Sequence, residues 1–271
     1  MVKKFKIFNS FNIPNEFKKS IILIGNFDGL HSGHQKLFEL AKKYKTKYKS
    51  KVGVVTFDPI PKMFFNTKIK NYRISNFSQK VIYLKKFDVD FVINKKFDKN
   101  FSKITYFKFI KDILSEKLRS KFIFVSNNFR FGHKREGDVA QLKKYEKDFG
   151  YNLINPTPLM KNKKIISSTI IRKLLEEGKL SKANTFLKRN WEIEGKVQRG
   201  RMMGQKIGFP TCNIDIGNYV IAKPGVYAVK TRINDRRKFY KGIANLGYRP
   251  TFNQKKILLE VNIFNFSGNL Y

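Results

Sequence analysis

Two of the chain's three histidines, His31 and His34, lie in a glycine-rich segment that follows an apolar run. Over residues 25–34 the segment reads Gly-Asn-Phe-Asp-Gly-Leu-His-Ser-Gly-His. Imidazole N–H groups can donate to phosphate oxygens, and so can the backbone N–H groups at the start of a helix. A glycine at position 33 lets the backbone approach a ligand closely. We therefore expect this segment to hold the phosphates of a nucleotide.

A His-x-x-His pair also has two simpler interpretations, a pair of solvated surface histidines and a metal pair. The glycine-rich setting, which holds two of only three histidines, favours phosphate binding over the first. Zinc is disfavoured because no cysteine or acidic cluster completes a set of four ligands. The single cysteine, Cys212, is most simply a small packing residue.

The first half of the chain alternates between apolar runs and helical spacing. Residues 20–24, 51–57, 91–93 and 122–125 are predicted strands. Helices are predicted from residue 32 or 33 and over 78–87, 105–118, 138–149, 169–177 and 180–187. This alternation predicts an α/β fold, a doubly wound parallel sheet with helices on both faces. Ligands bind such sheets at the carboxyl ends of the strands, near the switch in strand order, so the 25–34 segment lies where chemistry is expected.

The helical spacing stops after Leu187, and a different pattern follows. Strands are predicted over 191–197, 225–231, 239–246 and 258–264, with glycines and Pro210 among the residues between the first two. This pattern predicts a small antiparallel β-barrel. We therefore expect two domains, at residues 1–187 and 188–271.

Composition limits the partners of the chain. Lys and Arg total 57 against 20 Asp and Glu, which gives a net charge of +37, and 41% of residues are hydrophobic. The lysines lie along the whole length rather than in one stripe, so the charge favours compositional drift over a nucleic-acid site. No apolar run approaches the roughly 20 residues of a membrane span, and no secretory signal is recognisable. One cysteine fits a reducing compartment, so a cytoplasmic protein is expected; oligomeric state is not predictable from the sequence.

Several motifs, taken in order, resemble one family. Gly25-x-Phe27-Asp28-Gly29-x-His31-x-Gly33-His34 is similar to the nucleotidylyltransferase signature of the bacterial bifunctional riboflavin kinase/FAD synthetases. The segments Thr56–Pro59, Asn128–Gly132 and Ile166–Arg172 resemble the family's later motifs. The resemblance implies that AMP passes from ATP to the phosphate of FMN, which gives FAD and pyrophosphate. Such a transfer needs positioned donors more than a covalent nucleophile.

The same resemblance implies roles for individual residues. It makes His31, His34 and Arg172 the catalytic residues. It implies that Asn128 and Arg130 lie on the flavin side. The remaining motif residues would contact the ATP phosphates: Gly25, Asn26, Phe27, Asp28, Gly33, Ser167, Ser168 and Thr169.

A second set of motifs resembles riboflavin kinase. It comprises the glycine-rich stretch 200–208 with Pro210-Thr211-Cys212-Asn213, then Pro224–Tyr227 and Asn245–Phe252. By resemblance, Gly208, Thr211 and Asn213 would bind ATP, and the last two would also hold Mg²⁺, which prefers oxygen ligands. The implied substrates are ATP, riboflavin and FMN.

The chain departs from the family pattern at several places. Ile60 stands where the family has His, Gln205 where it has Arg, and Asn262 and Asn265 where it favours His and Asp. The segment expected to carry the family's glutamate base would follow Tyr271, and Glu260 matches a structural position. We therefore expect FAD synthesis with an impaired kinase. Alternatives are a fully bifunctional enzyme, a transferase acting on another phosphate acceptor, and a basic RNA-binding protein on a decayed scaffold.

Overall fold

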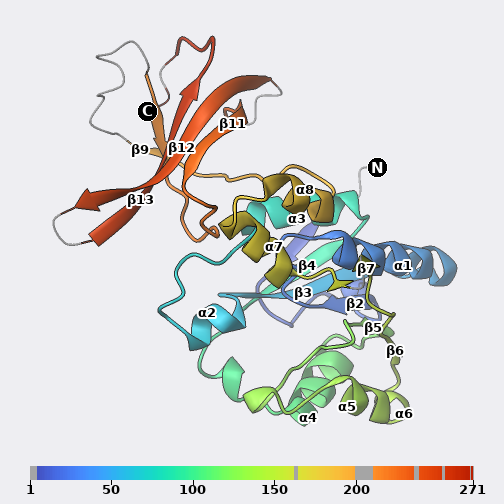
Figure 1. The fold of residues 1–271 in the computed structure, drawn as a ribbon. Coiled ribbons are helices and arrows are strands. Elements are labelled where there is room, and N and C mark those ends of the chain that lie inside the picture. Colours follow the sequence, from blue (N-terminus) through green and yellow to red (C-terminus); the bar gives the residue numbers. More distant parts are fainter. Residues whose placement is uncertain are drawn as a thin grey trace. The chain divides into compact units, whose positions relative to one another are not determined.

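The computed structural model describes residues 5–161, 164–198, 210–234, 238–251, 254–268 and 270. Its contacts divide the chain into two compact units (Figure 1). The first unit holds Met1–Lys70, Phe77–Ser168 and Phe186–Lys188, and the second holds Asn71–Asn76, Thr169–Thr185 and Arg189–Tyr271. Two inserted segments thus belong with the C-terminal part of the chain, and the functional boundary after Leu187 stays a prediction.

A six-stranded parallel sheet forms the centre of the first unit. Its strands are β1 (Lys6–Phe8), β2 (Ile21–Ile24), β3 (Val52–Asp58), β4 (Phe91–Lys96), β5 (Phe122–Phe124) and β6 (Asn152–Ile154). Their order is β1-β4-β3-β2-β5-β6, and every neighbouring pair is parallel. From β2 the chain builds β3 and β4 on one side and β5 and β6 on the other. The strand order therefore reverses at β2, which is where such sheets bind ligands.

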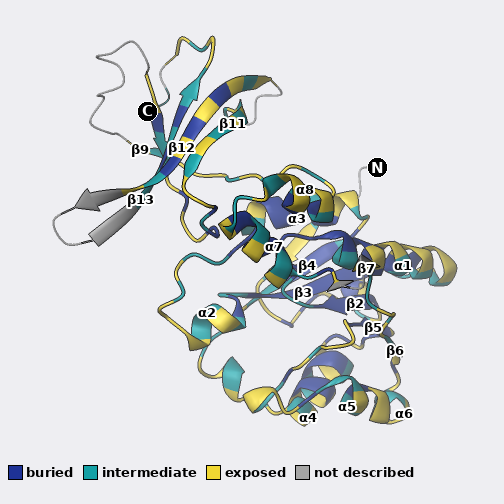
Figure 2. Ribbon diagram, in the orientation of Figure 1, coloured by how far each residue is buried: buried dark blue, intermediate teal, exposed yellow. Residues whose placement is uncertain are grey.

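Helices cover both faces of this sheet. They are α1 (Ser32–Tyr48), α2 (Pro61–Phe65), α3 (Phe77–Lys86), α4 (Tyr106–Lys108) with its continuation η3 (Phe109–Lys117), α5 (Val139–Lys144) and α6 (Glu146–Phe149). Ile22 and Ile24 pack with η3, whereas Ile21 and Leu23 pack with α1 and α3. Because successive strand residues face opposite sides, β2 is buried on both faces (Figure 2). The predicted doubly wound fold is confirmed.

A short hairpin and two helices follow β6 in the chain. A short hairpin pairs β7 (Met160–Lys161) with β8 (Lys164–Ile165). Two helices follow, α7 (Ser168–Glu176) and α8 (Leu180–Leu187), as the sequence predicts. Across the described ranges, no helix combines the length and apolarity needed to cross a bilayer.

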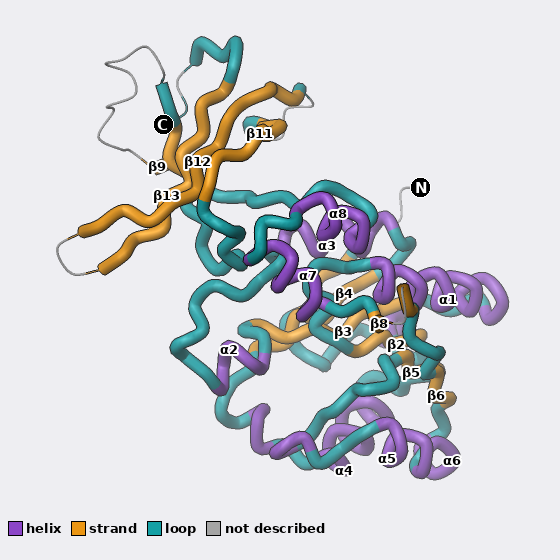
Figure 3. Tube along the Cα trace, in the orientation of Figure 1, coloured by secondary structure: helices purple, strands orange, loops and turns teal. Residues whose placement is uncertain are grey.

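The second unit contains an antiparallel sheet, as predicted. Its strands are β9 (Val197–Gln198), β10 (Cys212–Ile214), β11 (Gly225–Arg232), β12 (Phe239–Thr251) and β13 (Gln254–Ile263). They are ordered β11-β12-β13-β10-β9, and β11, β12 and β13 are the long neighbours (Figure 3). One face buries a small core of Cys212, Ile216, Ala222, Ala244, Leu246, Leu259 and Val261.

The predicted strand over 191–197 is wrong, because only Val197 belongs to a strand. Hydrogen bonds of Trp191, rather than pairing with a neighbouring strand, hold this segment. The Trp191 N–H donates to Asn184 Oδ1 at 2.7 Å, and its indole Nε1 donates to the carbonyl of Ile74 at 2.9 Å. Strand β12 extends beyond its predicted end at 246, and strand β13 begins at Gln254, before its predicted start at 258. The predicted helix 138–149 divides at Tyr145. The expectations at Gly200, Gly204, Gln205 and Gly208 lie outside the described residues.

Candidate functional site

The 25–34 segment joins the carboxyl end of β2 to the start of α1, where the strand order reverses. His31 is the N-cap of α1 and is only 4% exposed. Its Nδ1 accepts from the backbone N–H of His34 at 3.4 Å. Since Nδ1 is an acceptor, the proton of the neutral ring lies on Nε2. This geometry gives His31 a donor of the kind that a phosphate oxygen needs.

Ring packing fixes the two histidines: they stack on each other, and Phe27 packs edge-on against His34. The rings of His31 and His34 stack with centroids 3.7 Å apart and an angle of 22°. The ring of Phe27 meets His34 edge-on at 5.2 Å, and Phe27 itself takes a left-handed φ of 45°. Packing of this kind limits the rotamers that each imidazole can adopt. The histidine pair predicted from the sequence is therefore a preorganised unit.

Gly33 is required by packing as well as by any approaching ligand. A Cβ at this position would lie 3.2 Å from the His31 ring and 3.2 Å from the carbonyl oxygen of Ile166. Nine in ten real Cβ contacts are longer than this. The glycine thus lets the second predicted phosphate motif, which contains Ile166, approach the first.

Ser168 ties the start of α7 to the 25–34 segment. Its Oγ donates to the carbonyl oxygen of Asp28 at 2.9 Å. Within the same motif, Ser167 is half-buried and Thr169 is exposed. The two predicted phosphate motifs therefore meet through Asp28 and Ser168, while the roles of Ser167 and Thr169 stay predictions.

Arg172 is a buried cation of the second unit. It is 7% exposed, and its Nε donates to the carbonyl of Tyr72 at 2.7 Å. The guanidinium carbon lies 3.6 Å from the centroid of the Tyr72 ring, a cation–π contact. The 71–76 segment thus orients this side chain. Its role toward phosphates stays a prediction.

The predicted flavin-side residues follow β5, the strand beside β2. Arg130 Nη1 pairs with Asp138 Oδ2 at 2.8 Å, and Asp138 also caps α5 through its other oxygen. Asn128 is exposed and accepts from Ser126 Oγ at 2.9 Å. Both residues therefore lie in the loop at the carboxyl end of β5, which adjoins the switch point at β2.

Lys80 is a residue of this edge that the sequence analysis missed. It lies on α3, is 2% exposed, and its Nζ donates to the Asn26 carbonyl at 2.8 Å and to Thr56 Oγ1 at 3.0 Å. A lysine in a helix usually keeps its ammonium in water. The sequence does hold one sign that Lys80 is buried. It lies one turn before Leu84, on the buried face of α3.

A second group of polar residues lies on the sheet of the second unit. Asn213 is in β10, directly across from Glu260 of β13. Cross-strand partners of this kind project from the same face, with Cβ atoms about 5 Å apart. The Asn213 Oδ1 atom is buried and has no hydrogen-bond partner among the described residues. Thr211 is exposed immediately before β10. From the sequence, Glu260 was given a structural role only. The register that pairs it with Asn213 joins two distant strands and cannot be predicted from the sequence.

The departures from the family pattern have local structural roles. Ile60 is 3% exposed and packs in the interior. Asn262 donates from Nδ2 to the carbonyl of Pro210 at 2.7 Å, next to Thr211. Asn265 takes a left-handed φ of 54°, which Asn tolerates well. Cys212 is buried as predicted, and burial raises the pKa of its thiol.

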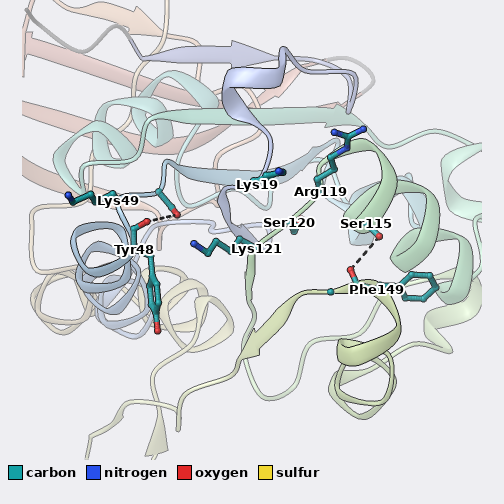
Figure 4. Close-up of a pocket in the computed structure, with 10 residues that line it drawn as sticks. Lys19, Tyr48, Lys49, Ser115, Arg119, Ser120, Lys121 and Phe149 are labelled. Carbon is teal, nitrogen blue, oxygen red and sulfur yellow. Dashed lines mark hydrogen bonds between the residues drawn. The ribbon is translucent and has the colours of Figure 1, made fainter.

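A pocket of about 610 Å³ lies at the opposite end of the parallel sheet (Figure 4). Residues just before β2, β3 and β5 line it together with residues of α1, η3 and α6. Its cations are Lys19, Lys49, Arg119 and Lys121, all of them exposed. In open α/β sheets the chemistry lies at the carboxyl ends of the strands. We therefore do not assign the transferase site to this pocket.

The sheet, its switch point and the histidine pair define a nucleotidylyltransferase-type protein with an added antiparallel β domain. Comparison with known families agrees: the FAD synthetase family matches residues 13–170, and the riboflavin kinase family matches residues 187–271. The chain therefore belongs to the bifunctional riboflavin kinase/FMN adenylyltransferase family.

Similar proteins include two members of that family. The chain is 39% identical to the bifunctional riboflavin kinase/FMN adenylyltransferase of Buchnera aphidicola subsp. Schizaphis graminum, over 96% of this chain and 84% of the relative. It is 35% identical to that of Escherichia coli K12, over 93% and 80%. A crystal structure described as a macrolide-efflux protein from Streptococcus pneumoniae matches with a TM-score of 0.84 and 28% identity. That match covers 98% of this chain and 86% of the other.

Proposed function

We propose that the 25–34 segment catalyses the transfer of AMP from ATP to FMN. A phosphate oxygen of FMN attacks the α-phosphorus of ATP, and the bond from that phosphorus to the bridging oxygen breaks. The bond electrons leave with pyrophosphate. The observation that carries this proposal is the stacked His31–His34 pair at the N-terminus of α1, at the switch point of the sheet.

Each part of the site has a role in that step. His31 Nε2 and the His34 ring would donate to phosphate oxygens as negative charge moves toward the leaving group. The N–H groups of the first turn of α1 add the positive end of the helix dipole. Ser167, Ser168, Thr169 and Arg172 would hold the pyrophosphate, and Asn128 and Arg130 would contact the flavin. The Asp28–Ser168 hydrogen bond supports a joint role for the two motifs.

The second unit would phosphorylate riboflavin. The Asn213 oxygen that lacks a partner among the described residues, with the Thr211 hydroxyl, offers the neutral oxygen ligands that suit Mg²⁺ beside ATP phosphates. When bound, Mg²⁺ would neutralise phosphate charge. In the described ranges no cluster of His, Cys, Asp and Glu competes as a metal site. Glu260, in register with Asn213, would accept the proton of the riboflavin hydroxyl as it attacks the γ-phosphorus and ADP leaves.

Glu260 bears on the expectation of an impaired kinase. That expectation assumed that no carboxylate of the chain could serve as the base. The register of β10 and β13 supports Glu260 in that role, so we propose that both activities are present.

ATP and flavins as substrates, together with a single buried cysteine, favour the cytoplasm as the location. No observation favours RNA binding, because the lysines remain spread over the chain.

The adenylyl-transfer proposal is tested by replacing one histidine of the pair. His34→Ala should lower FAD formation from FMN and ATP by roughly 100-fold, because a positioned donor is lost. The matched control is His133→Ala; this third histidine contacts the Ser102 carbonyl in another loop. Its rate should stay within about twofold of the parent rate, because it lies outside the anion site. Equal rates for both variants and the parent would contradict the proposal.

The kinase proposal is tested by Glu260→Gln, which keeps the size of the side chain and removes its basicity. Formation of FMN from riboflavin should fall by about 100-fold or more, whereas FAD formation from supplied FMN should not change. Glu192→Gln, at an exposed glutamate of the same unit, is the matched control. FMN formation at the parent rate by the Glu260→Gln variant would exclude Glu260 as the base.

A further inference from the structure

Lys80 is a buried lysine at the carboxyl edge of the parallel sheet, outside every motif that points to the nucleotide site. Its Nζ donates to the Asn26 carbonyl at 2.8 Å and to Thr56 Oγ1 at 3.0 Å. Thr56 Oγ1 in turn donates to the same Asn26 carbonyl at 3.3 Å. An ammonium group taken out of water is costly unless its donors are well satisfied. This three-way network therefore requires an account beyond simple packing.

The network joins the 25–34 segment to strand β3. Asn26 is the first residue after Gly25, and Thr56 is in β3, the strand beside β2. The backbone of Asn26 leads directly into Phe27, whose ring meets the His34 ring edge-on and lies 3.2 Å from where a Cβ on Gly25 would be. Because the network holds the Asn26 carbonyl in place, it also holds the beginning of the 25–34 segment, which carries the histidine pair.

Another buried lysine of the same unit provides a contrast. Lys45, near the end of α1, pairs with Asp90 at 2.9 Å and with Asp88 at 3.0 Å. It is 11 residues beyond His34 on one helix, about 16 Å along the axis. Its neighbours are the carboxylates of the turn before β4, at the amino end of the sheet. Lys45 therefore holds the fold together away from the proposed chemistry.

We propose that Lys80 is a positioning residue for adenylyl transfer. It holds the Asn26 carbonyl against Thr56, which sets the backbone course of the 25–34 segment and the place of His31 and His34. Its buried charge also lies at the same edge of the sheet as the 25–34 segment, which we propose binds the phosphates of ATP. The proposal rests on the proposed function of the 25–34 segment.

The direct test compares Lys80→Met with Lys45→Met. Both variants remove a buried ammonium and keep an unbranched side chain, so both should lower the melting temperature. Below both melting temperatures, Lys80→Met should lower kcat for FAD formation by roughly 100-fold, the effect of a misplaced catalytic group. Lys45→Met should keep kcat within about twofold, because its contacts are distant from the site. Equal kcat values for the two variants and the parent would overturn the proposal.

Substitutions at Thr56 keep the test decisive if Lys80→Met does not fold. Thr56→Val keeps the shape and removes the hydroxyl, so kcat should fall by about tenfold, and Thr56→Ser should restore it. Riboflavin phosphorylation by the same chains should be unchanged, which reports that the second unit is intact. A Thr56→Val variant with unchanged kcat would also overturn the positioning role.

Different results would contradict the proposed function of the 25–34 segment and the positioning role of Lys80. If His34→Ala leaves FAD formation unchanged, the proposed function of the segment is wrong, whatever Lys80 does. If His34→Ala is inactive while Lys80→Met and Thr56→Val have parent kcat, the transferase site stands and Lys80 serves stability alone.

Discussion

Lys80, at the carboxyl end of the parallel sheet, and the lysines that line the pocket at its amino end hold their charges in opposite ways. At the carboxyl end, Lys80 is buried and donates to the Asn26 carbonyl and to the Thr56 hydroxyl. At the amino end, Lys19, Lys49 and Lys121 line the pocket of Figure 4 with their side chains exposed to water.

This difference shows what distinguishes a site from a charged surface. An exposed ammonium is screened by water and salt, and it retains its rotamer freedom. A buried donor in a fixed network acts in a lower dielectric and needs no reorganisation when a charged transition state forms. In a chain of net charge +37, a buried donor that contacts the 25–34 segment therefore indicates function better than local charge does, whereas the buried Lys45 pairs with Asp88 and Asp90.

Among three further changes that test this comparison, Gly33→Ala should have the largest effect. The new Cβ would lie 3.2 Å from the His31 ring and from the Ile166 carbonyl, so the ring must shift. FAD formation should fall roughly tenfold, because a displaced donor loses part of its transition-state interaction. Gly247→Ala, where a Cβ would meet nothing within 4 Å, is the control. Parent activity in the Gly33→Ala chain would show that the ring position is unimportant.

A smaller loss is expected from Ser168→Ala. The variant loses the hydrogen bond from Ser168 Oγ to the Asp28 carbonyl, which joins the two phosphate motifs. At about 1 kcal/mol for one hydrogen bond, kcat/KM for ATP should fall about fivefold. Ser102→Ala, whose hydroxyl donates to the Lys99 carbonyl on the surface, should have no measurable effect. An equal loss in the two variants would mean that the Asp28 contact has no special role.

The smallest effect should come from the amino end. A chain with Lys19→Gln, Lys49→Gln and Lys121→Gln loses three exposed charges of the pocket. Its kcat/KM for ATP should change by less than about twofold, and the difference should vanish in added salt. Steady-state kinetics at low and high ionic strength measure this. A tenfold loss that persists in salt would place nucleotide binding at the amino end and contradict the comparison.

Local pattern was enough to predict most of the first unit. The apolar run before Gly25 and the helical spacing after Ser32 predict β2 and α1, because both elements are specified by neighbouring residues. The two-histidine segment was found from residue types alone. The prediction of a strand over 191–197 failed because Asn184, seven residues earlier, and Ile74, distant in sequence, take up the hydrogen bonds of Trp191.

The missed site residues share one cause. Lys80 reaches Asn26 and Thr56 across the packing of α3 on the sheet, and Glu260 meets Asn213 through strand register. Both relations are tertiary, so neither spacing nor composition contains them. Arg172 is the intermediate case: a motif singled it out, but its stacking on Tyr72 depends on the inserted 71–76 segment.

The most direct test of two separate sites is a crossed product assay on His31→Ala and Thr211→Ala. Each chain is given ATP and Mg²⁺ with either riboflavin or FMN, and FMN and FAD are separated and quantified. His31→Ala should still make FMN from riboflavin but lose about 100- to 1,000-fold in FAD formation, whereas Thr211→Ala should do the reverse. If Thr211→Ala abolishes FAD formation from FMN while the chain stays folded, the assignment of two independent sites is wrong.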